Sequence, residues 1–187
     1  IPLLVGFKYK ELINGDSYSS NNEDIMHSLE PNVTLFLILI SFVFALGGVY
    51  YVVRYLHNQT MLSVTTSRKK MDWSRFFFAF SLWAIFTVVS TLLFYFVSPD
   101  DFIINFKPIP FAILVIIGAL LIPIQTSTEE YVFRGYLMQG FANLSKNRWF
   151  PLLMTSIIFG GMHLSNPEVL KMGNIVLVYY IGTGLFL

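Results

Sequence analysis

Cysteine is absent from this chain of 187 residues, which excludes disulfide bonds, thiolate metal ligands and a cysteine nucleophile. Charged residues are also scarce: they make up 12% of the sequence, about half the share usual in soluble domains, whereas hydrophobic residues make up 55%. The formal net charge of +1 does not favour nucleic acid as a partner. With aromatic residues at 17%, the composition predicts an all-α, polytopic transmembrane protein embedded in a lipid bilayer.

Long uncharged runs predict where the chain crosses the membrane. Three of them cover residues 33–53, 76–99 and 108–128, each long enough for a helix to span about 30 Å of hydrocarbon. Two further apolar runs cover residues 149–167 and 172–187. We therefore expect one membrane-embedded domain over residues 1–187, a helical bundle with about five to six spans. Because apolar runs extend to both ends, we expect the chain to be a fragment that is truncated at both ends.

The charges of the connecting loops predict the orientation. Residues 54–75 contain five basic residues and one acidic residue, and residues 142–148 contain two basic residues. The stretches 8–32 and 100–107 each contain more acidic than basic residues. The positive-inside rule therefore predicts that loops 54–75 and 142–148 are cytoplasmic and that 8–32 is an external loop of an integral plasma-membrane protein.

One apolar segment is too long for a simple crossing. A single helix over residues 108–141 would be about 50 Å long, which exceeds the thickness of the bilayer. Pro123 predicts a kink, and the polar residues 125–128 that follow it resemble a helix cap. We therefore expect a second helix to begin near Thr128. Glu129 and Glu130 would then lie in its first turn, where the helix dipole favours carboxylates.

A group of ionisable residues lies between two apolar segments, where such residues are costly and usually functional. Glu130 and Arg134 are four residues apart, so they share a helix face and can form an ion pair. Glu129 lies about 100° further round the helix and has no local partner, which leaves its carboxylate able to act as a general base. The alternative interpretation is a structural salt bridge beside a glutamate that caps the helix.

A histidine in the following apolar run is the second candidate. Phe159 and His163 are four residues apart and share a helix face. The turn near Lys146 is equally distant from Glu129 and His163, so a helical hairpin over residues 122–164 would bring these two side chains level. A carboxylate that faces an imidazole is a minimal arrangement for activating water. The alternative is a histidine that serves packing alone.

These residues resemble two motifs of a known family. Glu129-Glu130-x-x-x-Arg134 followed by Gly135, and then Phe159-x-x-x-His163, are similar to the first motifs of the CAAX protease and bacteriocin-processing (CPBP/Abi) family, intramembrane endopeptidases related to the type II CAAX prenyl endopeptidase. The resemblance implies an all-helical membrane fold in which Glu129 and His163 activate water to hydrolyse a peptide bond. Glu130, Arg134 and Phe159 would support them. It also implies a peptide or protein substrate at or in the membrane, and a prokaryotic source.

The family's later motif has a histidine followed four residues on by Asn or Asp, which is thought to polarise the scissile carbonyl. No histidine follows His163, so we expect this motif beyond Leu187.

Other hydrolytic chemistries lack their sequence signals. His-Glu-x-x-His does not occur and the chain has three histidines in total, so we expect no metal and no cofactor. Gly-x-Ser-x-Gly, the serine nucleophile motif, does not occur either. Two alternatives to a protease stay open. One is a non-catalytic membrane scaffold or bacteriocin-immunity or regulatory protein with the same fold. The other, ranked last, is a transporter with a proton relay, which would need several broken helices.

Overall fold

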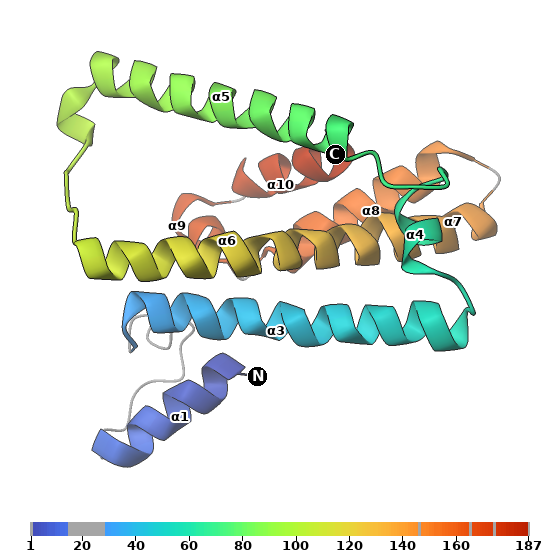
Figure 1. The fold of residues 1–187 in the computed structure, drawn as a ribbon, viewed down its shortest axis with the longest axis horizontal. Coiled ribbons are helices and arrows are strands. Elements are labelled where there is room, and N and C mark those ends of the chain that lie inside the picture. The colour runs from blue at the N-terminus through green and yellow to red at the C-terminus, as the bar shows by residue number, and fades with distance from the viewer. Residues whose placement is uncertain (1, 15–28, 146, 165, 174, 187) are drawn as a thin grey trace.

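The computed structural model describes residues 2–14, 29–145, 147–164, 166–173 and 175–186, and these residues form helices without any strand (Figure 1). Three continuous helical segments are long and apolar enough to cross a membrane: Pro31–Leu56, Trp73–Val97 and Pro108–Leu144. They contain the whole of the predicted runs 33–53 and 108–128, and residues 76–97 of the predicted run 76–99. The all-α membrane fold class predicted from composition is therefore confirmed.

The long segments and the shorter helices follow one another in a simple order. The first long segment consists of α3 (Pro31–Tyr51) and the π-helical turn η1 (Val52–Leu56), and the second is α5 (Trp73–Val97). The third joins α6 (Pro108–Glu130), the π-helical η3 (Tyr131–Leu137) and α7 (Met138–Leu144). The shorter elements are α1 (Pro2–Asn14), α4 (Met61–Thr65), η2 (Pro99–Asp101), α8 (Trp149–Met162), α9 (Pro167–Met172) and α10 (Ile175–Phe186).

Two predicted boundaries differ from the observed ones. The run 149–167 was expected as one span, but α8 ends at Met162 after 14 residues, or about 21 Å. Residues 163 and 164 form a turn, and a separate short helix begins at Pro167. At the other end of the chain, residues 8–14 of the predicted external loop 8–32 are helical and belong to α1, while residues 15–28 lie outside the described residues.

Helices α3 and α6 run parallel and are joined by side chain to backbone hydrogen bonds. The Asn32 amide donates to the Pro110 carbonyl at 3.0 Å, and the Thr128 hydroxyl donates to the Phe42 carbonyl at 3.3 Å. Both polar side chains are buried, so these bonds satisfy groups that lipid would leave unpaired. Helix α5, which lies between α3 and α6 in the sequence, runs in the opposite direction and returns the chain to the end at which both helices begin (Figure 1).

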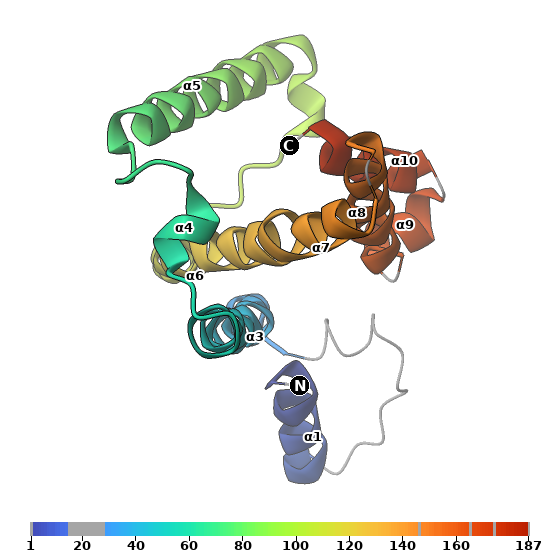
Figure 2. The same ribbon diagram turned by 90° about the vertical axis from the view of Figure 1, so that its right-hand side faces the viewer.

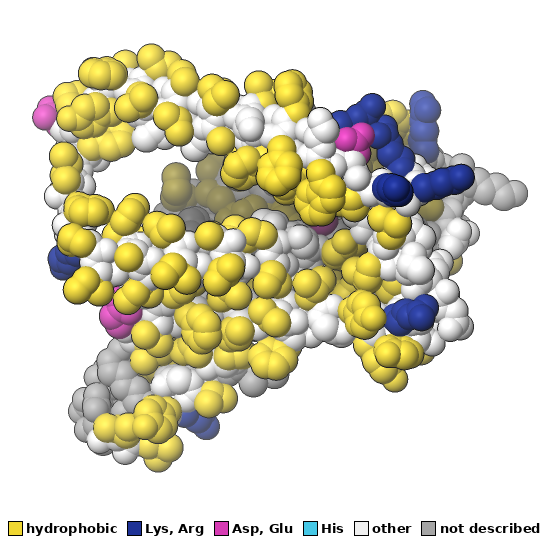
Figure 3. All heavy atoms as spheres, viewed as in Figure 1, with side chains coloured by type: hydrophobic (Ala, Val, Ile, Leu, Met, Phe, Trp, Pro, Cys, Tyr) yellow, Lys and Arg dark blue, Asp and Glu magenta, His cyan; other side chains and the backbone are white. Residues whose placement is uncertain are grey.

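Helix α5 stands apart from the other helices. None of its residues is buried against the described chain, exposed apolar side chains occur in every turn, and the face seen in Figure 3 is largely apolar. A helix that is hydrophobic all round requires an apolar environment. Its surface therefore suits contact with lipid.

The predicted break near Pro123 is wrong, because α6 continues through the proline to Glu130. The hydroxyl of Thr126 donates to the Ile122 carbonyl at 3.1 Å, and that of Thr128 donates to the Ile124 carbonyl at 2.7 Å. These hydroxyls therefore bond back to the preceding turn, as in a helix interior, instead of capping a new helix. The hydrogen-bond pattern of the helix changes from α to π after Glu130, where η3 begins. There the Met138 N–H reaches the Phe133 carbonyl five residues back.

The hairpin places α8 against α7, and α10 then packs on α8 (Figure 2). Two glycines permit the close approach of α10. A Cβ atom on Gly160 would meet the Ile181 side chain and lie 3.3 Å from the Ile181 backbone nitrogen. A Cβ atom on Gly184 would lie 3.1 Å from Cα of Ser156, whose side chain is fully buried. Small residues at such contacts let helix backbones come close together within a membrane.

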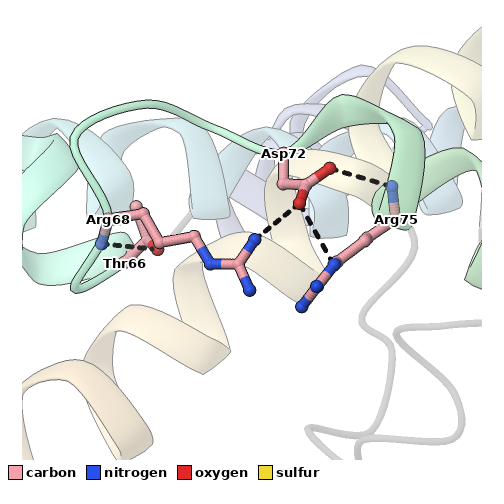
Figure 4. A network of polar contacts seen from close by, with 4 residues as sticks. All are labelled: Thr66, Arg68, Asp72 and Arg75. Atoms are coloured by element: carbon pink, nitrogen blue, oxygen red, sulfur yellow. Dashed lines mark hydrogen bonds and ion pairs between the residues drawn. The ribbon is translucent and has the colours of Figure 1, made fainter.

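The basic segments lie at one end of the long helices. The segment around α4 and the turn between α7 and α8 both lie at the right-hand end of the long helices in Figure 1. Lys and Arg side chains gather at this end in Figure 3. Asp72 organises this region: it bonds Arg68 at 2.6 Å and Arg75 at 3.1 Å, and it accepts from the Arg75 N–H at the start of α5 (Figure 4). Both predicted cytoplasmic loops therefore share one end of the molecule.

The glycine contact predicts a difference between two adjacent positions. Gly160→Ala should destabilise the fold by about 1–2 kcal/mol, because the new methyl group would collide with Ile181 in α10. The matched control is Gly161→Ala, which should leave stability unchanged or slightly raised, since nothing lies within 4 Å of that position. Thermal unfolding of both variants in detergent measures the difference. Equal melting temperatures for the two variants would contradict the packing described.

Candidate active site

Glu129 and His163 line the same cavity, although they lie in different helices. The cavity has a volume of about 440 Å³, is partly open, and is lined by α3, α6, η3, the end of α8 and the turn that follows it. Its polar side chains are those of Gln125, Thr128, Glu129, His163 and Asn166, and apolar side chains form the remaining wall. The hairpin thus brings together the two residues that the sequence singles out for water activation.

Glu129 lies in the last turn of α6 and is half-buried. The Gln125 side-chain amide donates to one oxygen of its carboxylate, Oε1, at 3.3 Å. Both residues line the cavity, so this hydrogen bond orients the carboxylate at the cavity wall. Gln125 is a contact that sequence reasoning missed, although its position four residues before Glu129 places it on the same helix face.

His163 follows the last residue of α8, and its imidazole is fixed from two sides. The Nδ1 atom bonds the carbonyl of Phe159 at 2.8 Å. Because a carbonyl oxygen can only accept, Nδ1 carries the proton, and Nε2 is the basic nitrogen of the neutral ring. The Phe159 ring also contacts the imidazole, with centroids 4.7 Å apart, and packs edge-on against buried Phe133 at 5.2 Å. The predicted shared face of Phe159 and His163 is therefore observed as a direct contact.

Glu130 and Arg134 form the ion pair that their spacing predicted. The Arg134 guanidinium also donates through Nη2 to the Gly184 carbonyl in α10 at 3.3 Å. Glu130 contributes to a second cavity on another side of the helix, whereas Glu129 lines the cavity with His163. The two neighbouring carboxylates are therefore separated: one is paired with arginine and the other faces the histidine cavity.

Gly135 and Tyr131 connect η3 to the basic segment. A Cβ atom on Gly135 would lie 3.0 Å from Cγ1 of Val64, so a larger residue would require the Val64 side chain to shift by a few tenths of an ångström. The hydroxyls of Tyr131 and Thr65 are 2.7 Å apart, and Thr65 donates its own proton to the Met61 carbonyl. Tyr131 is therefore the donor to Thr65. These contacts hold α4 beside the segment that follows Glu129.

Metal ligands do not cluster in the part of the chain that the structure describes: no three His, Asp or Glu side chains come together there.

Comparison with known proteins finds the same kind of family that the motifs resemble. Residues 108–187, which contain both motifs and helices α6 to α10, match the sequence model of the type II CAAX prenyl endopeptidase Rce1-like family. We call residues 108–187, which are similar to this family, the Rce1-like region. The resemblance seen in the motifs of this Rce1-like region is thereby confirmed.

One curated relative extends the similarity beyond the Rce1-like region. The chain is 35% identical over 141 residues to the uncharacterized protein YyaK of Bacillus subtilis (strain 168), an alignment that covers 75% of this chain and 47% of that protein. The chain thus spans about half the length of this relative. No solved structure matches the chain.

Proposed function

We propose that the Rce1-like region forms the active site of an intramembrane endopeptidase of the CAAX protease type. The observation that carries this proposal is the shared cavity, in which a half-buried carboxylate and an imidazole with a basic Nε2 face the same space. Arg134 pairs with Glu130 and not with Glu129, so the carboxylate at the cavity keeps its capacity to accept a proton.

The chain's own residues divide the reaction between them. Glu129 accepts a proton from a water molecule while the water oxygen bonds to the scissile carbonyl carbon. His163 holds the same water by accepting a hydrogen bond at Nε2. The C–N bond then breaks, and the proton held by Glu129 passes to the leaving nitrogen, which gives a carboxyl and an amine product. Gln125 orients the carboxylate, and the pair of Glu130 and Arg134 fixes the helix that bears it.

The substrate that suits this site is a peptide or protein segment at or within the membrane. The cavity lies among helices that are apolar on their outer faces, and much of its own wall is apolar. The name of the matched family points to prenylated C-terminal peptides as one class to test. A hydrophobic peptide without a prenyl group is the second class.

Removal of the base should abolish hydrolysis. Glu129→Gln keeps the size of the side chain but cannot accept the proton, so we expect its kcat to fall by at least about 100-fold. We expect the kcat of His163→Ala to fall as well. Full-length protein in liposomes, given a farnesylated CAAX peptide and a hydrophobic unprenylated peptide, allows cleavage to be measured by mass spectrometry.

The matched control is Glu30→Gln, because Glu30 accepts from the Val33 N–H at the start of α3 and does not line the cavity. It should cleave at the wild-type rate. Undiminished cleavage by Glu129→Gln would overturn the proposed chemistry. A biological phenotype that survives both site substitutions would instead favour a non-catalytic scaffold.

We also propose that the end carrying the two basic segments, 54–75 and 142–148, faces the cytoplasm of a prokaryotic cell, because the positive-inside rule applies to both. Since these 187 residues contain no cysteine, the Asn58→Cys variant of this chain offers a single thiol in the first of these segments. A membrane-impermeant thiol reagent should label it only after the cells are opened. Labelling in intact cells would contradict this orientation and indicate the opposite one.

A further inference from the structure

Tyr180 in α10 stacks on the imidazole of His163. The ring centroids are 4.2 Å apart and the ring planes differ by 24°, which is a stacked arrangement. Tyr180 belongs to neither sequence motif and follows both of them in the chain. Phe159 also contacts the imidazole, at 4.7 Å and a tilt of 48°, so α8 and α10 each supply one aromatic ring to His163.

Tyr180 is itself held in place by two independent sets of contacts. The side-chain amide of Asn166, which lines the cavity, donates to the Tyr180 hydroxyl at 3.4 Å. The helix that carries Tyr180 is held close to α8 at Gly160 and Gly184. The position of α10 thus fixes the backbone of Tyr180, and the hydrogen bond from Asn166 holds its hydroxyl group.

A single hydrogen bond does not define the orientation of an imidazole. The bond from Nδ1 to the Phe159 carbonyl fixes one atom of the ring but leaves rotation about that bond. A stacked aromatic ring at 4.2 Å opposes this rotation, because tilting the imidazole further would break the stack or produce a collision. The direction in which Nε2 points therefore depends on Tyr180.

We propose that Tyr180 is a positioning residue that sets the plane of the His163 imidazole, and so aims Nε2 into the cavity, with Asn166 holding the Tyr180 hydroxyl. This inference rests on the proposed peptidase function. Small misplacement of a catalytic group lowers the rate of the chemical step without a matching loss of substrate binding.

Substitution of the ring separates stacking from other roles. Tyr180→Leu keeps an apolar side chain but removes the ring, and we expect kcat to fall about 10-fold or more while KM changes less than about 3-fold. Tyr180→Phe keeps the ring and should retain most of the activity. The matched control is Tyr55→Leu, because Tyr55 is 63% exposed and does not line the cavity; its activity should equal that of the wild type.

Carbon NMR relaxation of labelled histidine adds a readout that loss of stability alone would not move. The order parameter of the His163 Cε1–H bond should be high in the wild type and in Tyr180→Phe, and lower in Tyr180→Leu, because the stacked ring limits rotation of the imidazole. Retention of both wild-type kcat and the high order parameter in folded Tyr180→Leu would overturn the inference, as would equal losses of kcat in Tyr180→Leu and Tyr180→Phe.

The result for Glu129→Gln distinguishes the two proposals. If Glu129→Gln is inactive and Tyr180→Leu is fully active, the peptidase stands and the role of Tyr180 fails. If Glu129→Gln is active, the proposed function fails first, and the inference about Tyr180 fails with it.

Discussion

The close packing of α10 against α8 is the contact on which the geometry of the site depends. Gly160 and Gly184 leave no room for a side chain, so the two helices approach at backbone distance. The same approach brings Tyr180 onto His163 and places the Gly184 carbonyl within reach of Arg134. One helix beyond both motifs therefore contacts the histidine motif directly and the glutamate motif through its arginine.

The apolar surroundings explain why the buried polar groups have hydrogen-bond partners within the protein. Among the described residues, no buried polar side-chain atom lacks a hydrogen-bond partner. Hydroxyls such as that of Thr128 bond back to the helix backbone, and Arg134 is shared between a carboxylate and a carbonyl. This pairing is expected where lipid offers no hydrogen bonds. Glu129 and His163 also have hydrogen-bond partners, but unlike these groups they line a cavity of about 440 Å³.

Local patterns in the sequence were sufficient for the long helices and for contacts within one helix. The uncharged runs predicted the three long segments, and the four-residue spacings predicted the contacts of Glu130 with Arg134 and of Phe159 with His163. The expected break at Pro123 was wrong because a threonine hydroxyl has the same sequence signature whether it caps a new helix or donates to the preceding turn. Tyr180 had no local signal, since only tertiary packing brings α10 to His163.

Proximity of Glu129 and His163 across the hairpin is the central claim, and crosslinking in native membranes tests it most directly. Because these 187 residues contain no cysteine, a Glu129→Cys and His163→Cys double variant of this chain can be treated with a short bifunctional thiol reagent without competing thiols of its own. The control pair is Glu130→Cys with His163→Cys, because Glu130 lines a different cavity from His163. Rapid crosslinking of the first pair and slow crosslinking of the control is the predicted result. Equal rates for the two pairs, or no crosslink in the first, would contradict the shared site.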